Sequence, residues 1–92
     1  MNNKQKYYNY IVDDLVSKTK VDHEERSITM TWMTDVSEFT SKLAFGYFRL
    51  MGPSTFRFMD YVIPKFGMRD EEVTIVLDMY REKMKTLIDN EQ

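Results

Sequence analysis

The most apolar run in the chain covers residues 36–51, and its spacing is that of an amphipathic helix. Residues that recur every three or four positions fall on one arc at 100° per residue: Val36, Phe39, Leu43, Tyr47 and Leu50. The sequence therefore predicts a central helix that buries this arc in the core. Asp35 and Glu38 form a capping-box-like start, and Pro53 ends the helix because it disfavours helical backbone at Gly52.

Two more helices are predicted near the ends of the chain. Residues 7–16 carry an apolar stripe made of Tyr8, Ile11, Val12, Leu15 and Val16. A last helix with Asp70 as its cap carries the longest stripe, made of Val73, Val76, Leu77, Tyr80, Met84, Leu87 and Ile88. Its first turn is acidic, which suits the positive end of the helix dipole.

A third helix is expected to begin at Ser54 or Thr55, after the Gly52-Pro53 turn. Its inner side is formed by Phe56, Met59, Val62, Ile63 and Phe66. Pro64 should kink or end this helix, because proline lacks an amide hydrogen and clashes with the preceding turn. Gly67 is the expected C-terminal stop.

The hydrophobic period changes to two between Ser27 and Thr34. Ile28, Met30 and Trp32 alternate with less apolar neighbours, as in a half-buried strand. A single strand needs a partner, and residues 18–21, a second copy of the chain and the sheet edge of another protein all fit. A helical continuation into Val36 is the competing interpretation.

These elements predict a mostly α fold of about four helices with a short strand or hairpin near residues 18–34, with an α+β fold as the alternative. The 92 residues are expected to form one small globular domain, with a polar lead at 1–6 and a frayed tail at 89–92. We found no motif that identifies a known family.

Composition removes most catalytic chemistry. The chain has no cysteine and a single histidine, His23, so thiolate catalysis and zinc sites built from Cys and His lack ligands. Its three glycines are too dispersed for a phosphate-binding loop. We therefore nominate no catalytic residue, no metal ligand and no cofactor. The polar N-terminus and the lack of an 18-residue apolar run predict a cytoplasmic protein without a membrane partner.

Several apolar residues fall off the predicted core stripes, which suggests helices covered on two sides. Together with one cation, they are the candidate partner-binding residues: Phe45, Phe48, Arg49, Phe58, Tyr61, Ile75 and Met79. Aromatic residues and methionine are enriched at interface cores. The alternative is that the third and last helices pack around the central helix and bury these residues.

The resulting hypothesis is a non-enzymatic protein–protein interaction module, an adaptor or inhibitor that forms a homodimer and binds a protein of unknown identity. In size and in its lack of an active site, it resembles the small proteins that phages and mobile elements direct at host machinery. The alternative is an accessory nucleic-acid-binding protein, because Lys42, Arg49 and Arg57 lie among aromatic residues with no acid between Phe39 and Met59. The formal net charge of -2 gives that alternative no support over the whole chain.

Overall fold

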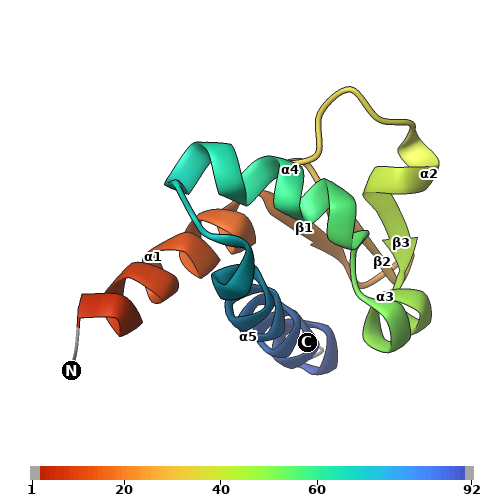
Figure 1. The fold of residues 1–92 in the computed structure, drawn as a ribbon. Helices are drawn as coiled ribbons and strands as arrows, with labels where there is room; N and C mark the ends of the chain where they lie inside the picture. Colours follow the sequence, from red (N-terminus) through yellow and green to blue (C-terminus); the bar gives the residue numbers. More distant parts are fainter. Residues whose placement is uncertain (1–2, 91–92) are drawn as a thin grey trace.

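The computed structural model describes residues 3–90, which contain five helices and a three-stranded antiparallel sheet (Figure 1). In chain order the elements are α1 (Asn3–Ser17), β1 (Thr19–Asp22), β2 (Ser27–Met30), α2 (Glu38–Ser41), β3 (Lys42–Ala44), α3 (Phe45–Met51), α4 (Thr55–Phe66) and α5 (Asp70–Asp89). The predicted mostly α fold with a short hairpin is confirmed. Residues 3–6 of the expected lead belong to α1 and Asp89 to α5, whereas 1–2 and 91–92 lie outside the described residues.

The predicted strand finds its partner within the chain. β1 and β2 form an antiparallel hairpin in which Val21 faces Ile28, and β3 extends the sheet on the other side of β2. The Asp22 carboxylate accepts hydrogen bonds from the amides of Glu24 and Glu25, which closes the connecting turn. β2 ends at Met30, so the strand is shorter than predicted, although Trp32 is still buried.

The helices α1, α4 and α5 confirm three of the four predicted helices, with small corrections at their ends. Arg69, and not Asp70, occupies the cap position of α5, and its amide donates to Glu72 Oε1 at 3.2 Å. Pro64 does not end α4, which continues to Phe66 and stops at Gly67 in the left-handed conformation. In Figure 1, α4 crosses above α1 and α5.

The prediction of a single central helix over residues 36–51 is wrong. Residues 36–51 form instead the one-turn α2, the strand β3 and the short α3, with Ser37 and not Asp35 at the cap position of α2. β3 pairs with β2, so the chain is extended where the helix was expected. The predicted core arc is largely exposed: Phe39 is 92% exposed and Leu50 76%. Phe56, predicted on the inner side of α4, is 80% exposed as well.

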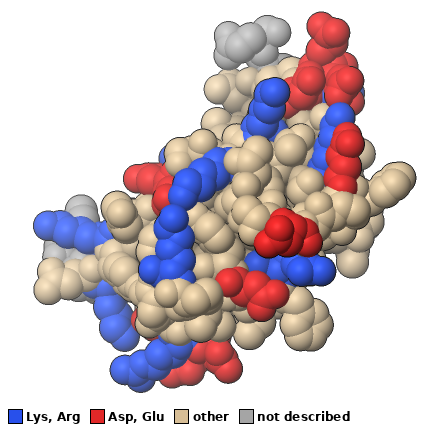
Figure 2. Space-filling view, turned by 90° about the horizontal axis from the view of Figure 1, so that it is seen from above, with Lys and Arg blue, Asp and Glu red and all other residues tan. Residues whose placement is uncertain are grey.

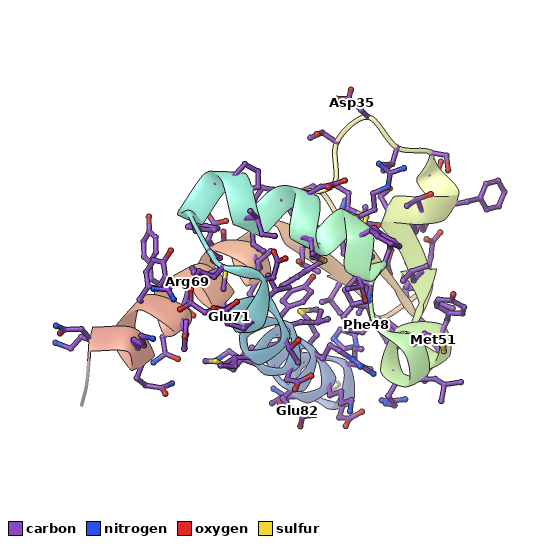
Figure 3. The ribbon with its side chains drawn as sticks, viewed as in Figure 1. Asp35, Phe48, Met51, Arg69, Glu71 and Glu82 are labelled. Atoms are coloured by element: carbon purple, nitrogen blue, oxygen red, sulfur yellow. The ribbon has the colours of Figure 1, made fainter. Side chains whose placement is uncertain are left out.

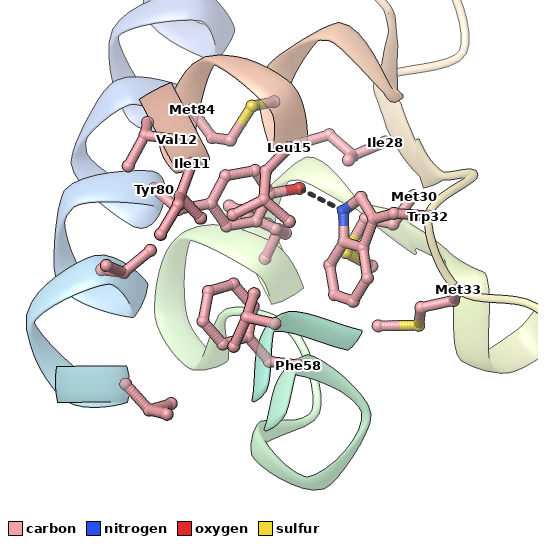
Figure 4. Packing of buried hydrophobic residues seen from close by; sticks show 14 of the residues in the cluster. Ile11, Val12, Leu15, Ile28, Met30, Trp32, Met33, Phe58, Tyr80 and Met84 are labelled. Atoms are coloured by element: carbon pink, nitrogen blue, oxygen red, sulfur yellow. Dashed lines mark hydrogen bonds between the residues drawn. The ribbon is translucent and has the colours of Figure 1, made fainter. Parts of the chain in front are cut away.

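The centre of the core is the side chain of Tyr80 on α5, which is fully buried. Its ring lies 5.9–6.0 Å from the rings of Trp32, Phe48 and Phe58. The indole nitrogen of Trp32 donates to the Tyr80 hydroxyl at 3.1 Å, as the dashed line in Figure 4 shows. Burial raises the pKa of Tyr80 to about 12, so the hydroxyl stays protonated at neutral pH.

The Tyr80 hydroxyl also reaches β1. Thr19 Oγ1 lies 2.7 Å from it and donates its own hydrogen to the Leu15 carbonyl at 2.6 Å. Tyr80 therefore donates to Thr19 while it accepts from Trp32, and this chain of hydrogen bonds joins α1, β1, the segment after β2, and α5.

Replacing Tyr80 by phenylalanine should destabilise the protein by about 1–3 kcal/mol, because the buried Trp32 N–H and the Thr19 hydroxyl each lose a partner. Urea unfolding followed by circular dichroism measures this loss. Tyr10→Phe is the matched control, since Tyr10 is 65% exposed and should change stability by less than about 0.5 kcal/mol. Equal stabilities of the two variants would contradict the structural role of the hydroxyl.

A second polar contact joins α1 to the start of α5. The Tyr8 hydroxyl donates to Glu72 Oε2 at 2.8 Å, while the Arg69 amide bonds the other carboxylate oxygen. Both hydrogen bonds favour the ionised carboxylate, and they lower the pKa of Glu72 below its ordinary value of 4.5.

Because the pKa of Glu72 is lowered by folding, its contribution to stability is fully present above about pH 4.5 and is lost as the pH falls through the folded value. Glu72→Gln should therefore be less stable than the wild type at pH 7, and the difference should shrink at pH 3. Thermal unfolding at both pH values measures it, with Glu82→Gln as the control on the same helix. A difference that is independent of pH would contradict this role.

Candidate protein-interaction surface

The structure buries three of the predicted partner-binding residues. Phe45 and Phe48 are 1% exposed and Phe58 is fully buried, so these side chains cannot contact a partner of the folded chain. Phe48 and Phe58 both pack on the ring of Tyr80. The prediction that they face solvent is wrong, and the alternative that they are absorbed by the core is the one that the structure shows.

Phe45 was expected on the solvated face, and the hairpin covers it. The imidazole of His23 lies edge-on to its ring at 5.6 Å, and the Arg26 guanidinium lies over the ring at 5.2 Å from its centre. Both residues come from the turn between β1 and β2. The pairing of β3 with β2 brings them there, since the Phe45 amide donates to the Arg26 carbonyl at 3.0 Å.

Tyr61 is half-buried, and its hydroxyl is occupied within the chain. The hydroxyl donates to Asp14 Oδ2 at 2.7 Å and accepts from the Lys18 ammonium at 2.9 Å. Burial alone would raise the pKa of Asp14, but the hydrogen bonds from Tyr61 and Lys18 hold it below its ordinary value. This cluster holds α4 against α1.

The two predicted residues on α5 remain accessible to different degrees. Ile75 is 46% exposed, whereas Met79 is half-buried against the core cluster. Because three of the seven predicted residues are in the core and Ile75 is exposed, the structure does not collect the seven into one surface site.

Two of the three cations proposed for nucleic-acid binding are ion-paired within the chain. Lys42 lies 3.1 Å from Glu25, and Arg49 pairs with Asp89 near the end of α5. Arg57 lines a hollow together with Asp35 and Asp60. Figure 2 shows basic and acidic side chains together on the face seen from above. The three cations therefore pair with or neighbour acids from different elements, which argues against a continuous basic surface.

A different group of apolar side chains lies on the surface, at the end of the molecule formed by α2, β3 and α3. We call this group the apolar face, and it comprises Phe39, Leu43, Tyr47, Leu50 and Met51. Leu43 is half-buried, whereas Tyr47 and Met51 are 55% and 58% exposed. Figure 3 shows why α3 contributes to both sides: Phe48 lies toward the core and Met51 lies on the outer side.

The apolar face is hollowed beside the turn that leads into α4. A groove of about 340 Å³ is bordered by Phe39, Leu43, Tyr47 and Met51 and by residues 52–55. Gly52 and Pro53 are buried although they belong to a turn. The groove therefore has apolar side chains on the side of α2, β3 and α3, and the hydroxyls of Thr40, Ser54 and Thr55 also line it.

Arg81 fixes the turn that forms one end of the groove. Its guanidinium donates to the Leu50 carbonyl at 3.2 Å, at the end of α3. Gly52 has φ 71° and ψ −169°, a backbone conformation that is accessible essentially only to glycine. A Cβ atom there would lie 2.7 Å from Arg81 Nε, so the arginine side chain would have to move to admit it.

The sequence contains a signal for the end of the predicted central helix at the junction of β3 and α3. Gly46 lies in the middle of the predicted central helix, where glycine costs about 0.5–1 kcal/mol relative to alanine. In the structure it lies in the first turn of α3, beside the junction with β3. A helix boundary near Gly46 would have separated Tyr47 and Leu50 from the arc that contains Phe39 and Leu43, so the side of Phe48 could have been taken as the buried one.

Within residues 3–90 we find no group of three or more His, Cys, Asp or Glu side chains arranged to hold a metal ion. None of the described helices has both the length and the apolar character needed to cross a bilayer. The chain matches no protein-family model, no curated protein and no solved structure.

Gly52→Ala should destabilise the protein by about 1–3 kcal/mol, because it adds backbone strain and a clash with Arg81. Gly67→Ala is the matched control: Gly67 also has positive φ, but a Cβ there meets no atom within 4 Å. Urea unfolding of both variants measures the two losses, and the loss should be larger at Gly52, where a more restricted backbone conformation and the contact with Arg81 act together. A smaller loss at Gly52 than at Gly67 would contradict the close packing of Arg81 on the turn.

Proposed function

We propose that the protein is a non-enzymatic interaction module, an adaptor or inhibitor that binds another protein through the apolar face. The observation that carries the proposal is the exposure of large apolar side chains on one contiguous end of the fold. Phe39, Tyr47, Leu50 and Met51 together expose an area on the order of 500 Å², at the upper end of what the largest patch on a monomer shows.

The energetics favour a protein partner. Covering one Phe or Leu side chain contributes roughly 1.5–3 kcal/mol, so three such residues supply enough to offset part of the entropy lost on association. The rim of the face is polar and carries both signs, with Glu38 and the ion-paired Lys42 beside Phe39. An apolar centre with a polar rim is the usual composition of a protein–protein interface.

A photo-crosslinking amino acid placed at position 47, on the apolar face, tests the proposal in the cells that express the protein. We expect discrete protein adducts from position 47 and none from position 10, an exposed tyrosine on α1. The adducts should be lost when the same chain carries Phe39→Ser and Leu50→Ser. Both residues are largely exposed, so the double variant should keep its helical content and unfolding midpoint.

A second double variant, Tyr10→Ser with Ile75→Ser, removes exposed apolar residues outside the apolar face and is the matched control. It should leave the adducts of position 47 unchanged. Identical adducts from positions 10 and 47, or adducts that survive Phe39→Ser with Leu50→Ser, would refute the assignment of the apolar face. The adducts need not be with a second copy, so this test is independent of self-association.

A further inference from the structure

The outer edge of β3 is open. In the described sheet β3 pairs with β2 on one side and has no strand on the other. The Phe45 amide donates to the Arg26 carbonyl at 3.0 Å, and this bond fixes which backbone groups face β2. Because alternate residues of an antiparallel strand direct their groups to opposite edges, Leu43 bonds toward β2, and the Lys42 carbonyl and Ala44 amide point to the open edge.

The other two outward groups are already used. The Lys42 amide donates to the Glu38 carbonyl at the end of α2, and the Ala44 carbonyl lies at the cap position of α3. One acceptor, at Lys42, and one donor, at Ala44, therefore remain on either side of Leu43. In an antiparallel pair centred on two facing residues, the amide after one residue donates to the carbonyl before the other. The edge of β3 is thus complementary to itself.

We propose that β3 pairs with β3 of a second copy of this chain, across a two-fold axis at Leu43. The Ala44 amide of each copy donates to the Lys42 carbonyl of the other, and the two sheets join into one of six strands. This proposal rests on the proposed function, since it names a second copy as the partner of the apolar face.

The same register brings the apolar faces together. Phe39 precedes Leu43 by four residues and Tyr47 follows it by four, so the two-fold axis places α2 of one copy beside α3 of the other. The exposed ring of Phe39 then has the apolar side of the facing α3 to pack on. Glu38 and Lys42 border the same hollow as Phe39, so each copy offers an acid and a base to its twin. Such a self-complementary patch is the requirement of a two-fold interface.

The area is consistent with a dimer. The apolar face contributes on the order of 500 Å² per copy, and a stable interface needs about 800 Å² per partner. Phe56 at the start of α4 is 80% exposed next to the groove residue Thr55, and it extends the apolar area. The apolar area alone is smaller than a standard interface, so the polar rim has to supply the remaining contact area.

Ala44→Pro tests the strand pairing directly. Proline removes only the Ala44 amide hydrogen, which β2 does not use, and Ala44 has φ −67°, which suits the proline ring. The preceding Leu43 is extended, as a residue before proline prefers. We expect the wild type to show the mass of two chains by light scattering at micromolar concentration, and Ala44→Pro to show the mass of one with unchanged helical content.

Ala44→Ser keeps the amide and is the matched control, so it should remain a dimer. Hydrogen exchange of the Ala44 amide gives an independent readout that needs no variant. The amide should exchange at least tenfold more slowly in the concentrated protein than in the diluted protein, whereas the Leu43 amide, bonded to β2, should change little.

Three outcomes would overturn the proposal. A wild-type monomer at all concentrations removes the second copy but leaves the crosslinking test of the apolar face untouched. A dimer that survives Ala44→Pro but is lost in Phe39→Ser with Leu50→Ser shows an interface without strand pairing. Exchange of the Ala44 amide that does not depend on concentration excludes this edge even if Ala44→Pro fails to fold.

Discussion

The buried hydroxyl of Tyr80 is the constraint on which the rest of the structure depends. A polar group in the middle of an apolar core is costly unless it is hydrogen-bonded, and here it is bonded on both sides, by the Trp32 indole and by Thr19. These partners come from both sides of the open end of the hairpin, where Thr19 faces Met30 and Trp32 follows two residues later. The hydroxyl therefore fixes where β1 and β2 lie on α5, which aromatic and aliphatic packing alone would specify less sharply.

The aromatic cluster around Tyr80 also determines which side of α3, in the central segment 36–51, is buried. Phe48 and Phe58 both contact its ring, and both must come from the side of their helix that faces α5. Once Phe48 is turned inward, Tyr47, Leu50 and Met51 are turned outward, because they lie on the other side of the same short helix. The apolar face is the geometrical consequence of this choice.

The sequence predicted the two long helices well because their polar sides are unambiguous. In α5 charged residues alternate with the stripe that contains Val76, Tyr80 and Met84, so only one face can be buried. Residues 18–21 were one of three strand partners that the sequence left open, and the structure pairs them with β2 within the chain.

The central segment could not be predicted in the same way. It has two apolar sides, and a hydrophobic period shows that a side is apolar without showing which of two the core will take. A strand of three residues such as β3 is too short to establish a period of two. The pattern did indicate that something must cover both sides. It assigned the uncovered side to Phe45 and Phe48, while the structure leaves Phe39 and Leu50 uncovered.

The length of β3 also limits what its open edge can do. Long, flat edge strands are templates for uncontrolled pairing, and proteins commonly guard them with charges or keep them short. The charged residue of β3 is Lys42, and its ammonium group lies 3.1 Å from the Glu25 carboxylate, which offsets the charge. A strand of three residues flanked by α2 and α3 admits few registers, and pairing about Leu43 uses the free edge of both copies at once. The proposed association through this edge would therefore close at two chains and would not continue into a fibre.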